Sequence, residues 1–225
     1  MFRNILFVIL FILVYGLIFL LGSYSPASTL TDRAENGTFT TAIDGSVVYR
    51  TDLYGLELSY EPDWIVFDGL QLEKQFRDQL TEAEIEESFG CPIGDLAFLG
   101  GFLTPQASLR VTAEKGNAIP SQSFTADDIR SLIDETNSWI IRAGGSWGNG
   151  SGYILPAQGN GERIILYYYD YKYLGEYYAT FSAMLNVKGN IVYLDGYYND
   201  LDGLATLTDF IKNKLRVTAS GNSAV

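Results

Sequence analysis

The stretch RIILYYYDYKYLGEYYATF (residues 163–181) contains seven tyrosines among its first sixteen residues. Tyrosine has a high propensity for β-strands, and aromatic side chains paired across neighbouring strands stabilise a sheet. Successive side chains of a strand point to opposite faces. We therefore expect Tyr167, Tyr169 and Tyr171 to share one face of a sheet, with Tyr168 and Asp170 on the other face.

Gly175 interrupts this stretch, and the alternation resumes after it. Tyr177 and Ala179 fall on one face, whereas Tyr178 and Thr180 fall on the opposite face. Two alternating segments on either side of a glycine predict a long antiparallel hairpin. A third strand, IVYLDGYY, follows a Lys-Gly-Asn turn, so the whole region is predicted to be an antiparallel meander that ends at residue 198.

The remaining sequence supplies further strands and helices. Alternating or β-branched residues predict strands at 46–51, 56–60, 95–99, 107–113 and 151–155. Residues 70–90 favour one or two short helices, because Glu, Gln and Leu are good helix formers and TEAE is a capping box. SWGNGSG (146–152) is expected to be a loop.

Two longer helices are predicted from apolar residues at helical spacing. The first runs from Thr125 to Gly144, with one face formed by Ile129, Leu132, Ile133, Thr136 and Ile140. The second closes the chain, with one face formed by Leu204, Leu207, Ile211 and Leu215. The order of strands and helices predicts an α+β fold.

Four pieces of the sequence resemble the PsbP-like superfamily. They are VVYRTDLYGLELSYEPDW (47–64), ASLRVTAEKG (107–116), the meander ERIILYYYDYKYLGEYYATFSAMLNVKGNIVYLDGYY (162–198) and ATLTDFIKNKL (205–215). Domains of this superfamily often begin with a tyrosine, a turn, a glycine, an alternating strand and a Pro-x-Trp. The resemblance covers most of residues 46–216 and consists of structural motifs without catalytic ones.

The resemblance implies an α/β/α sandwich with a central antiparallel β-sheet. Members of the superfamily are typically non-catalytic accessory domains that bind other proteins, often exported and near membranes. This chain departs from them in its helical segment at 70–90 and in its apolar N-terminus. No binding residue of the superfamily is transferred to this sequence.

The N-terminus contains an uncharged apolar segment, Ile5 to Leu21, preceded by Arg3. As a helix, its seventeen residues would rise about 26 Å, close to the roughly 30 Å thickness of the hydrocarbon core of a bilayer. This length favours a single-pass anchor, with the N-terminus in the cytoplasm and the rest of the chain outside it. The alternative is a signal peptide cleaved near Ser25-Pro26-Ala27, which would give a secreted protein.

The sequence therefore divides into four expected segments. Residues 1–22 are the membrane anchor or signal segment, and residues 23–36 are a small, polar linker. Residues 37–217 form the PsbP-like α/β domain. Residues 218–225 are expected to be a disordered tail.

The part of the chain after the apolar segment is acidic. It contains all 27 Asp and Glu residues and 14 of the 15 Lys and Arg residues, so its net charge is 14 − 27 = −13. Such a charge repels phosphate backbones, and tyrosines that stack on bases need a positive groove beside them. Nucleic acid is therefore excluded as an expected partner.

The absence of histidine excludes Ser-His-Asp and Cys-His catalysis and the H-E-x-x-H zinc site. The single cysteine, Cys91, forms no internal disulfide and is expected to be a small buried apolar side chain, with a reactive thiol or an intermolecular bridge as the alternative. Asp200, Asp202 and Asp209 occupy calcium-ligand positions of an EF-hand-like loop, but Tyr198 stands where the first carboxylate is needed. They are candidate calcium ligands, although acids at a helix start explain the same pattern.

Two classes of function remain. The first is a membrane-anchored extracytoplasmic accessory domain that binds another protein and needs neither catalysis nor a cofactor. Tyrosine is common on binding surfaces, and Tyr168 and Tyr178 share their expected faces with polar neighbours, so these two are the candidate partner-binding residues. The alternative is a carboxylate-based hydrolase or a carbohydrate-binding domain at the cell surface, although no pair of carboxylates stands out by its spacing.

Overall fold

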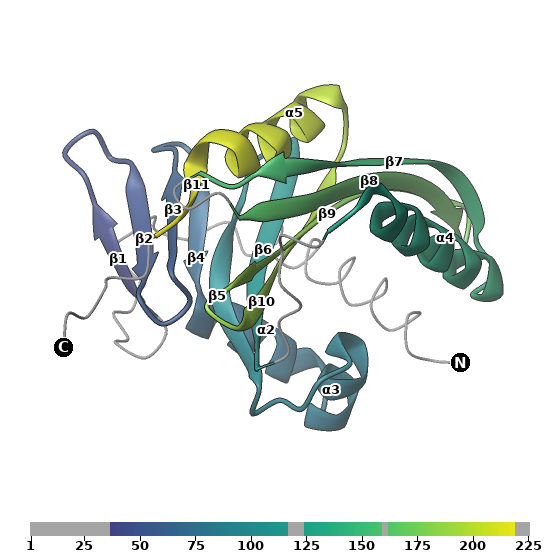
Figure 1. Cartoon of the computed structure of the whole chain (residues 1–225), viewed down its shortest axis with the longest axis horizontal. Helices are drawn as coiled ribbons and strands as arrows, with labels where there is room; N and C mark the ends of the chain where they lie inside the picture. Colours follow the sequence, from purple (N-terminus) through teal and green to yellow (C-terminus); the bar gives the residue numbers. More distant parts are fainter. Residues whose placement is uncertain (1–36, 117–123, 159–161, 219–225) are drawn as a thin grey trace.

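The computed structural model describes residues 37–116, 124–158 and 162–218 of the chain. These residues form two antiparallel β-sheets with helices packed against them (Figure 1). The predicted α+β fold with antiparallel sheets is confirmed. The strands expected in one central sheet are divided between two sheets of four and seven strands.

The larger sheet has the strand order β4-β5-β6-β10-β9-β8-β7. The predicted meander is β8 (Arg163–Tyr173), β9 (Glu176–Val187) and β10 (Asn190–Tyr198). The other strands are β4 (Ile65–Asp68), β5 (Leu96–Leu103), β6 (Ala107–Lys115) and β7 (Ser146–Pro156). Leu174 and Gly175 both have positive φ, 51° and 88°, which is the conformation of a two-residue hairpin turn. The predicted hairpin is therefore confirmed.

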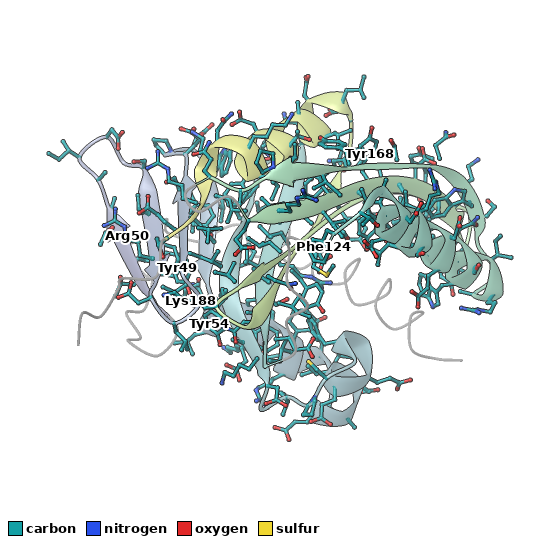
Figure 2. All side chains as sticks on the ribbon, in the orientation of Figure 1. Tyr49, Arg50, Tyr54, Phe124, Tyr168 and Lys188 are labelled. Carbon is teal, nitrogen blue, oxygen red and sulfur yellow. The ribbon has the colours of Figure 1, made fainter. Side chains whose placement is uncertain are left out.

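The smaller sheet has the strand order β1-β2-β3-β11. Its strands are β1 (Thr38–Thr41), β2 (Val47–Thr51), β3 (Leu56–Tyr60) and β11 (Leu215–Val217). The turn between β9 and β10 reaches this sheet, where the Lys188 ammonium donates a 2.7 Å hydrogen bond to the carbonyl of Asp52. Figure 2 shows Lys188 beside Tyr54. The turns of the two sheets are thus joined directly.

Helices cover both faces of the larger sheet. Residues paired across neighbouring strands share a face, and one such row is Phe98, Thr112, Tyr193, Met184 and Ile165. Helices α2 (Gly69–Gln79) and α3 (Glu82–Phe89) pack at the Phe98 end of this row, and α4 (Ala126–Arg142) packs at the Ile165 end. This side is called the α4 face. Helix α5 (Leu201–Asp209) and the π-helical turn η2 (Phe210–Lys214) pack on the opposite side, called the α5 face.

The main hydrophobic core lies between the α5 face, helix α5 and the smaller sheet. Its centre is aromatic. The Phe210 ring is fully buried, and its centroid lies 5.1 Å from that of Phe102 and 5.6 Å from that of Tyr60. Trp64 stacks on Phe102 at 4.2 Å. Phe210 therefore packs against residues of both sheets.

Local sequence explains where the helices begin. Asp68, Thr81 and Thr125 each accept a hydrogen bond from the backbone N–H three residues later, and each is half of a capping box. Gly69 opens α2 directly against strand β5, where a Cβ would lie 1.8 Å from the carbonyl oxygen of Phe98. The helices predicted at 70–90 and from Thr125 are confirmed.

Two element predictions are wrong. Residues 146–152 were expected to be a loop but belong to β7, the edge strand that pairs with β8. The glycines there suit close packing, since a Cβ on Gly152 would lie 2.7 Å from Ile129 of α4. Leu215 was expected on the last helix but begins β11 and pairs with Leu58. Leu215 is buried. The apolar spacing therefore identified a core residue, but it did not distinguish a helix from a strand.

No helix in the described part of the chain is long and apolar enough to span a membrane. The expected anchor at residues 5–21 and the expected linker at residues 23–36 lie outside the described residues, as does the expected tail from residue 219 onward.

Candidate functional site

The tyrosines of the meander divide between the two faces of the larger sheet. Tyr167, Tyr169 and Tyr171 lie on the α4 face, where neighbouring rings stack with centroids 6.0 Å apart. Tyr168 and Asp170 lie on the α5 face, where Tyr168 borders the main core. Figure 2 shows Tyr168 above the strands and Phe124, which packs beside α4, below them. The predicted distribution of these residues is confirmed.

The tyrosines on the α4 face are structural. Tyr171 is buried under α4 in contact with Ile140, and burial raises the pKa of its phenol. Its hydroxyl donates a hydrogen bond to Tyr197. The Tyr167 hydroxyl is hydrogen-bonded to Ser182, and to Thr136 on α4. These contacts hold α4 on the sheet.

A buried charged pair continues this hydrogen-bond network towards α2 and α3. Arg110 and Asp195 are directly paired across β6 and β10, with 3.8 Å between a guanidinium nitrogen and a carboxylate oxygen. The guanidinium lies 5.5 Å and 5.7 Å from the ring centroids of Phe76 and Phe89. Burial lowers the pKa of Arg110, and the charge of Asp195 opposes that shift. The Asp195 carboxylate also accepts a 2.9 Å hydrogen bond from Ser182.

This network was not predicted, because its residues are far apart in the sequence and come together only through strand register. Its donors and acceptors bind each other across the α4 face, from the aromatic rings of α2 and α3 to Thr136 of α4. An arrangement of this kind positions the helices. It places no activated nucleophile beside a base.

The α5 face carries an aromatic group of a different kind near the hairpin turn. Ala179 is directly paired with Asp170, and Tyr177 lies two residues away on the same face. On the other side, Tyr197 pairs with Thr180, so Tyr198 stands beside Ala179 on the α5 face. Three tyrosines and one carboxylate therefore surround a small residue. We call Tyr168, Asp170, Tyr177 and Tyr198 the tyrosine surface.

Interactions within the tyrosine surface support this arrangement. The Tyr177 hydroxyl donates a hydrogen bond to Asp170, which raises the pKa of Tyr177. Burial, followed by the electrostatic effect of Asp170, Tyr177 and Tyr168, raises the pKa of Tyr198 to about 12. Tyr177 is 58% exposed, whereas Tyr168, Asp170 and Tyr198 are half-buried. Tyr177 is therefore the most exposed side chain of the surface.

The two candidate partner-binding residues lie on opposite faces. Tyr168 is part of the tyrosine surface. Tyr178 stacks on Tyr171 at 5.2 Å on the α4 face and packs against the cluster around Ile140. The two residues therefore do not form one surface. Tyr177 lies on the same face as Tyr168, with the Asp170 and Ala179 pair between them, and its position next to the hairpin turn is the signal that identifies it.

The candidate calcium ligands occupy ordinary positions around α5. Asp200 is the N-cap and accepts a 2.8 Å hydrogen bond from the Gly203 N–H. Asp202 lies in the first turn, and Asp209, at the end of the helix, accepts a hydrogen bond from Asn213. Within the described ranges, no group of three or more Asp, Glu, Cys or His side chains is placed to hold a metal ion.

Cys91 is buried in the cluster beneath α2 and α3, as expected for a small apolar side chain. Burial, together with the nearby carboxylates of Glu114, Asp95 and Glu86, raises the pKa of its thiol to about 11. The neutral thiol is therefore the form present at physiological pH. A thiol in this environment is inert as a nucleophile.

Carboxyl groups with a shifted pKa in the described ranges are those of Asp44, Glu84 and Asp128. Hydrogen bonds lower the pKa in each case: from Ser46 to Asp44, from Thr81 to Glu84, and from Thr125 to Asp128. These shifts come from a turn and from helix caps. A general acid needs a raised pKa, so these groups suit structure and not proton donation.

No protein-family model matches the chain, and no curated protein matches its sequence. Among solved structures, it is similar to the PsbP protein (CyanoP) of Synechocystis sp. PCC 6803, with 13% identity and a TM-score of 0.47 over 78% of this chain and 94% of that one. It is also similar to LpqN, involved in cell envelope biogenesis of Mycobacterium tuberculosis, with 15% identity and a TM-score of 0.33 over 56% of this chain and 79% of that one. Both TM-scores lie below 0.5, so these matches describe a resemblance in fold and nothing more. The first match is a protein of the superfamily that the sequence resembles.

Proposed function

We propose that this chain is an accessory domain that is held outside the cytoplasm by its N-terminal segment, binds another protein and catalyses nothing. The observation that carries the proposal is the tyrosine surface on the α5 face. Its aromatic side chains lie at the surface of a sheet whose opposite face is covered by three helices. The location rests on the apolar residues 5–21 and on Arg3 before them.

Tyrosine suits this role for physical reasons. Its ring offers a large contact area and has few rotatable bonds, so little conformational entropy is lost on binding. Aromatic residues are enriched at protein–protein interfaces for the same reason. Two exposed apolar side chains are close in sequence to residues of the tyrosine surface. Leu174, at the hairpin turn, is 78% exposed, and Leu201, at the start of α5, is 81% exposed.

Replacing Tyr168 and Tyr177 together with Ser is expected to weaken partner capture by about tenfold or more, because two aromatic contacts near the centre of an interface are lost. The measurement is quantitative cross-linking and pull-down from membranes with the full-length chain. Tyr178→Ser is the matched control, since it removes the same side chain from the α4 face. It should lower the melting temperature while leaving capture by the folded protein unchanged.

Equal loss of capture in the control and in the double variant would contradict the assignment of the tyrosine surface. Turnover of any substrate that is abolished by changing one Asp or Glu would overturn the non-catalytic part of the proposal.

The anchor makes a separate prediction. The native protein should fractionate with membranes and stay there during carbonate extraction, because about seventeen apolar residues in a bilayer are not released by high pH. Replacing Leu13 and Leu17 with Arg should release the protein or prevent its export, since charge at the centre of a spanning helix is costly. A mature N-terminus found near Ser28 would show instead that residues 1–27 are a cleaved signal peptide.

A further inference from the structure

We infer that the tyrosine surface is a binding site for a cationic side chain, so that the partner presents a lysine or arginine to Tyr168, Tyr177, Tyr198 and Asp170. This inference rests on the proposed function and names the group that the surface recognises. It follows from the geometry of the strands, the position of the carboxylate and the charge of the chain.

The register places a small residue, Ala179, at the centre of the surface. Asp170 and Ala179 are directly paired, and so are Tyr168 and Phe181 on the next row of the α5 face. Ala179 is half-buried and contributes only a methyl group, whereas its neighbours on this face are large. Tyr177 and Tyr198 therefore flank Ala179 on this face, and Asp170 lies directly across from it.

The carboxylate of Asp170 is held in place by groups that do not neutralise it. Its Oδ1 accepts a 2.6 Å hydrogen bond from the backbone N–H of Asn149. The Tyr177 hydroxyl donates a second hydrogen bond to the same carboxylate. Gly148 leaves room for it, since a Cβ there would lie 1.6 Å from that oxygen. Both donors are neutral, so the negative charge stays at the surface.

These features are the ones that bind cations. The face of an aromatic ring carries partial negative charge and attracts an ammonium or guanidinium group within about 6 Å. A carboxylate among the rings adds a direct charge interaction. The rest of the molecule acts in the same direction, because the chain carries a net charge of −12 and attracts basic partners over longer distances.

One positive residue lies close to the surface. Lys172 is exposed on the same face, directly paired with Tyr177. No ion pair joins it to Asp170 in the part of the chain that the structure describes. The Lys172 ammonium therefore repels a cation of the partner, but it does not pair with the Asp170 carboxylate. Removing its charge should strengthen binding.

The test uses two probes with the same aliphatic stem, N-acetyl-lysine amide and N-acetyl-norleucine amide, which differ by the ammonium group. Binding to the full-length chain in a non-ionic detergent is measured by saturation-transfer NMR of the probe side chain, titrated to obtain affinities. The lysine probe should bind at least about fivefold more tightly than the norleucine probe. Added salt should reduce the difference.

Variants locate the binding site. Asp170→Asn should abolish the preference for lysine, and Lys172→Ala should increase it. Glu176→Gln is the matched control, because it removes one carboxylate from an exposed residue beside the same turn but outside the surface. It should leave the lysine affinity within about twofold of the original, as expected for a screened charge.

Equal affinity for the two probes would overturn the inference and describe an apolar contact surface. A lysine preference that survives Asp170→Asn would overturn it as well. Either result is distinct from failure of the proposed function, which is decided by partner capture with the Tyr168→Ser and Tyr177→Ser double variant. If partner capture depends on the two tyrosines but both probes bind equally, the cation-binding inference is rejected and the tyrosine surface remains the proposed protein-binding surface.

Discussion

Replacing Phe210 with alanine is expected to lower the free energy of unfolding by about 3–5 kcal/mol, the usual cost of removing a fully buried aromatic side chain. The Phe210 ring is 0% exposed and packs between Phe102, Tyr60 and Trp64. A cavity there would remove contacts between η2 and both sheets. Since domains are stable by about 5–15 kcal/mol, the melting temperature should fall by on the order of 10 °C.

Denaturant unfolding of the full-length chain measures this change. Ile43→Ala is the control, because the Ile43 side chain is fully exposed on the turn before β2, and its loss should alter the free energy of unfolding by less than about 0.5 kcal/mol. A loss below about 1 kcal/mol in Phe210→Ala would mean that the two sheets do not share the core described above.

Raising the pH above about 10 is expected to unfold the domain cooperatively, because many of its tyrosines are buried. Tyr49, Tyr60 and Tyr171 are at most 3% exposed, and burial raises the pKa of each phenol. Below the pKa of the unfolded phenol, near 10, the folded and unfolded states are equally protonated, and stability is unaffected. Above it, only the unfolded state loses protons. Stability is then lost by about 1.4 kcal/mol per pH unit for each such tyrosine.

Three tyrosines remove about 4 kcal/mol per pH unit in this range, so the domain should unfold within one to two units above about pH 10. Phenolate absorbance and circular dichroism should change together. Tyr60→Phe should reduce the slope by about 1.4 kcal/mol per pH unit, since the Tyr60 hydroxyl is buried without a hydrogen-bond partner in the described part of the chain. Gradual ionisation before any loss of structure would contradict the prediction.

The meander could be predicted because its alternation is strong and continuous. The long hairpin and the grouping of Tyr167, Tyr169 and Tyr171 follow from side chains that point to opposite faces of a strand. Strand β7 could not be predicted in the same way. Its glycines and serines carry no alternating pattern, and its conformation depends on pairing with β8 and on the approach of α4. The division into two sheets is also absent from the sequence, because apolar inner faces look alike in either sheet.

The site could be predicted only in part. Alternation shows which residues share a face, but it does not show which face a distant helix covers. Tyr178 shares its face with Thr180 and Ser182, and these polar neighbours suggested exposure to solvent. In the structure their hydroxyls are satisfied on the α4 face, by the Tyr169 carbonyl and the Asp195 carboxylate. Tyr177 shares its face with core residues, yet it lies beyond the end of the core.

The strict alternation along β8 has a consequence for how the length of this chain can change. One face of the strand supplies the tyrosines packed under α4, and the other supplies Tyr168 and Asp170. Inserting or deleting one residue within the strand would exchange the two sets, so that the charged group would be buried and the packed rings exposed. Changes in length are therefore expected at the hairpin turn, where Leu174 and Gly175 lie outside the strand pairing and the Leu174 side chain is exposed. Related chains should accordingly vary in length at this turn while the strands on either side keep a constant number of residues.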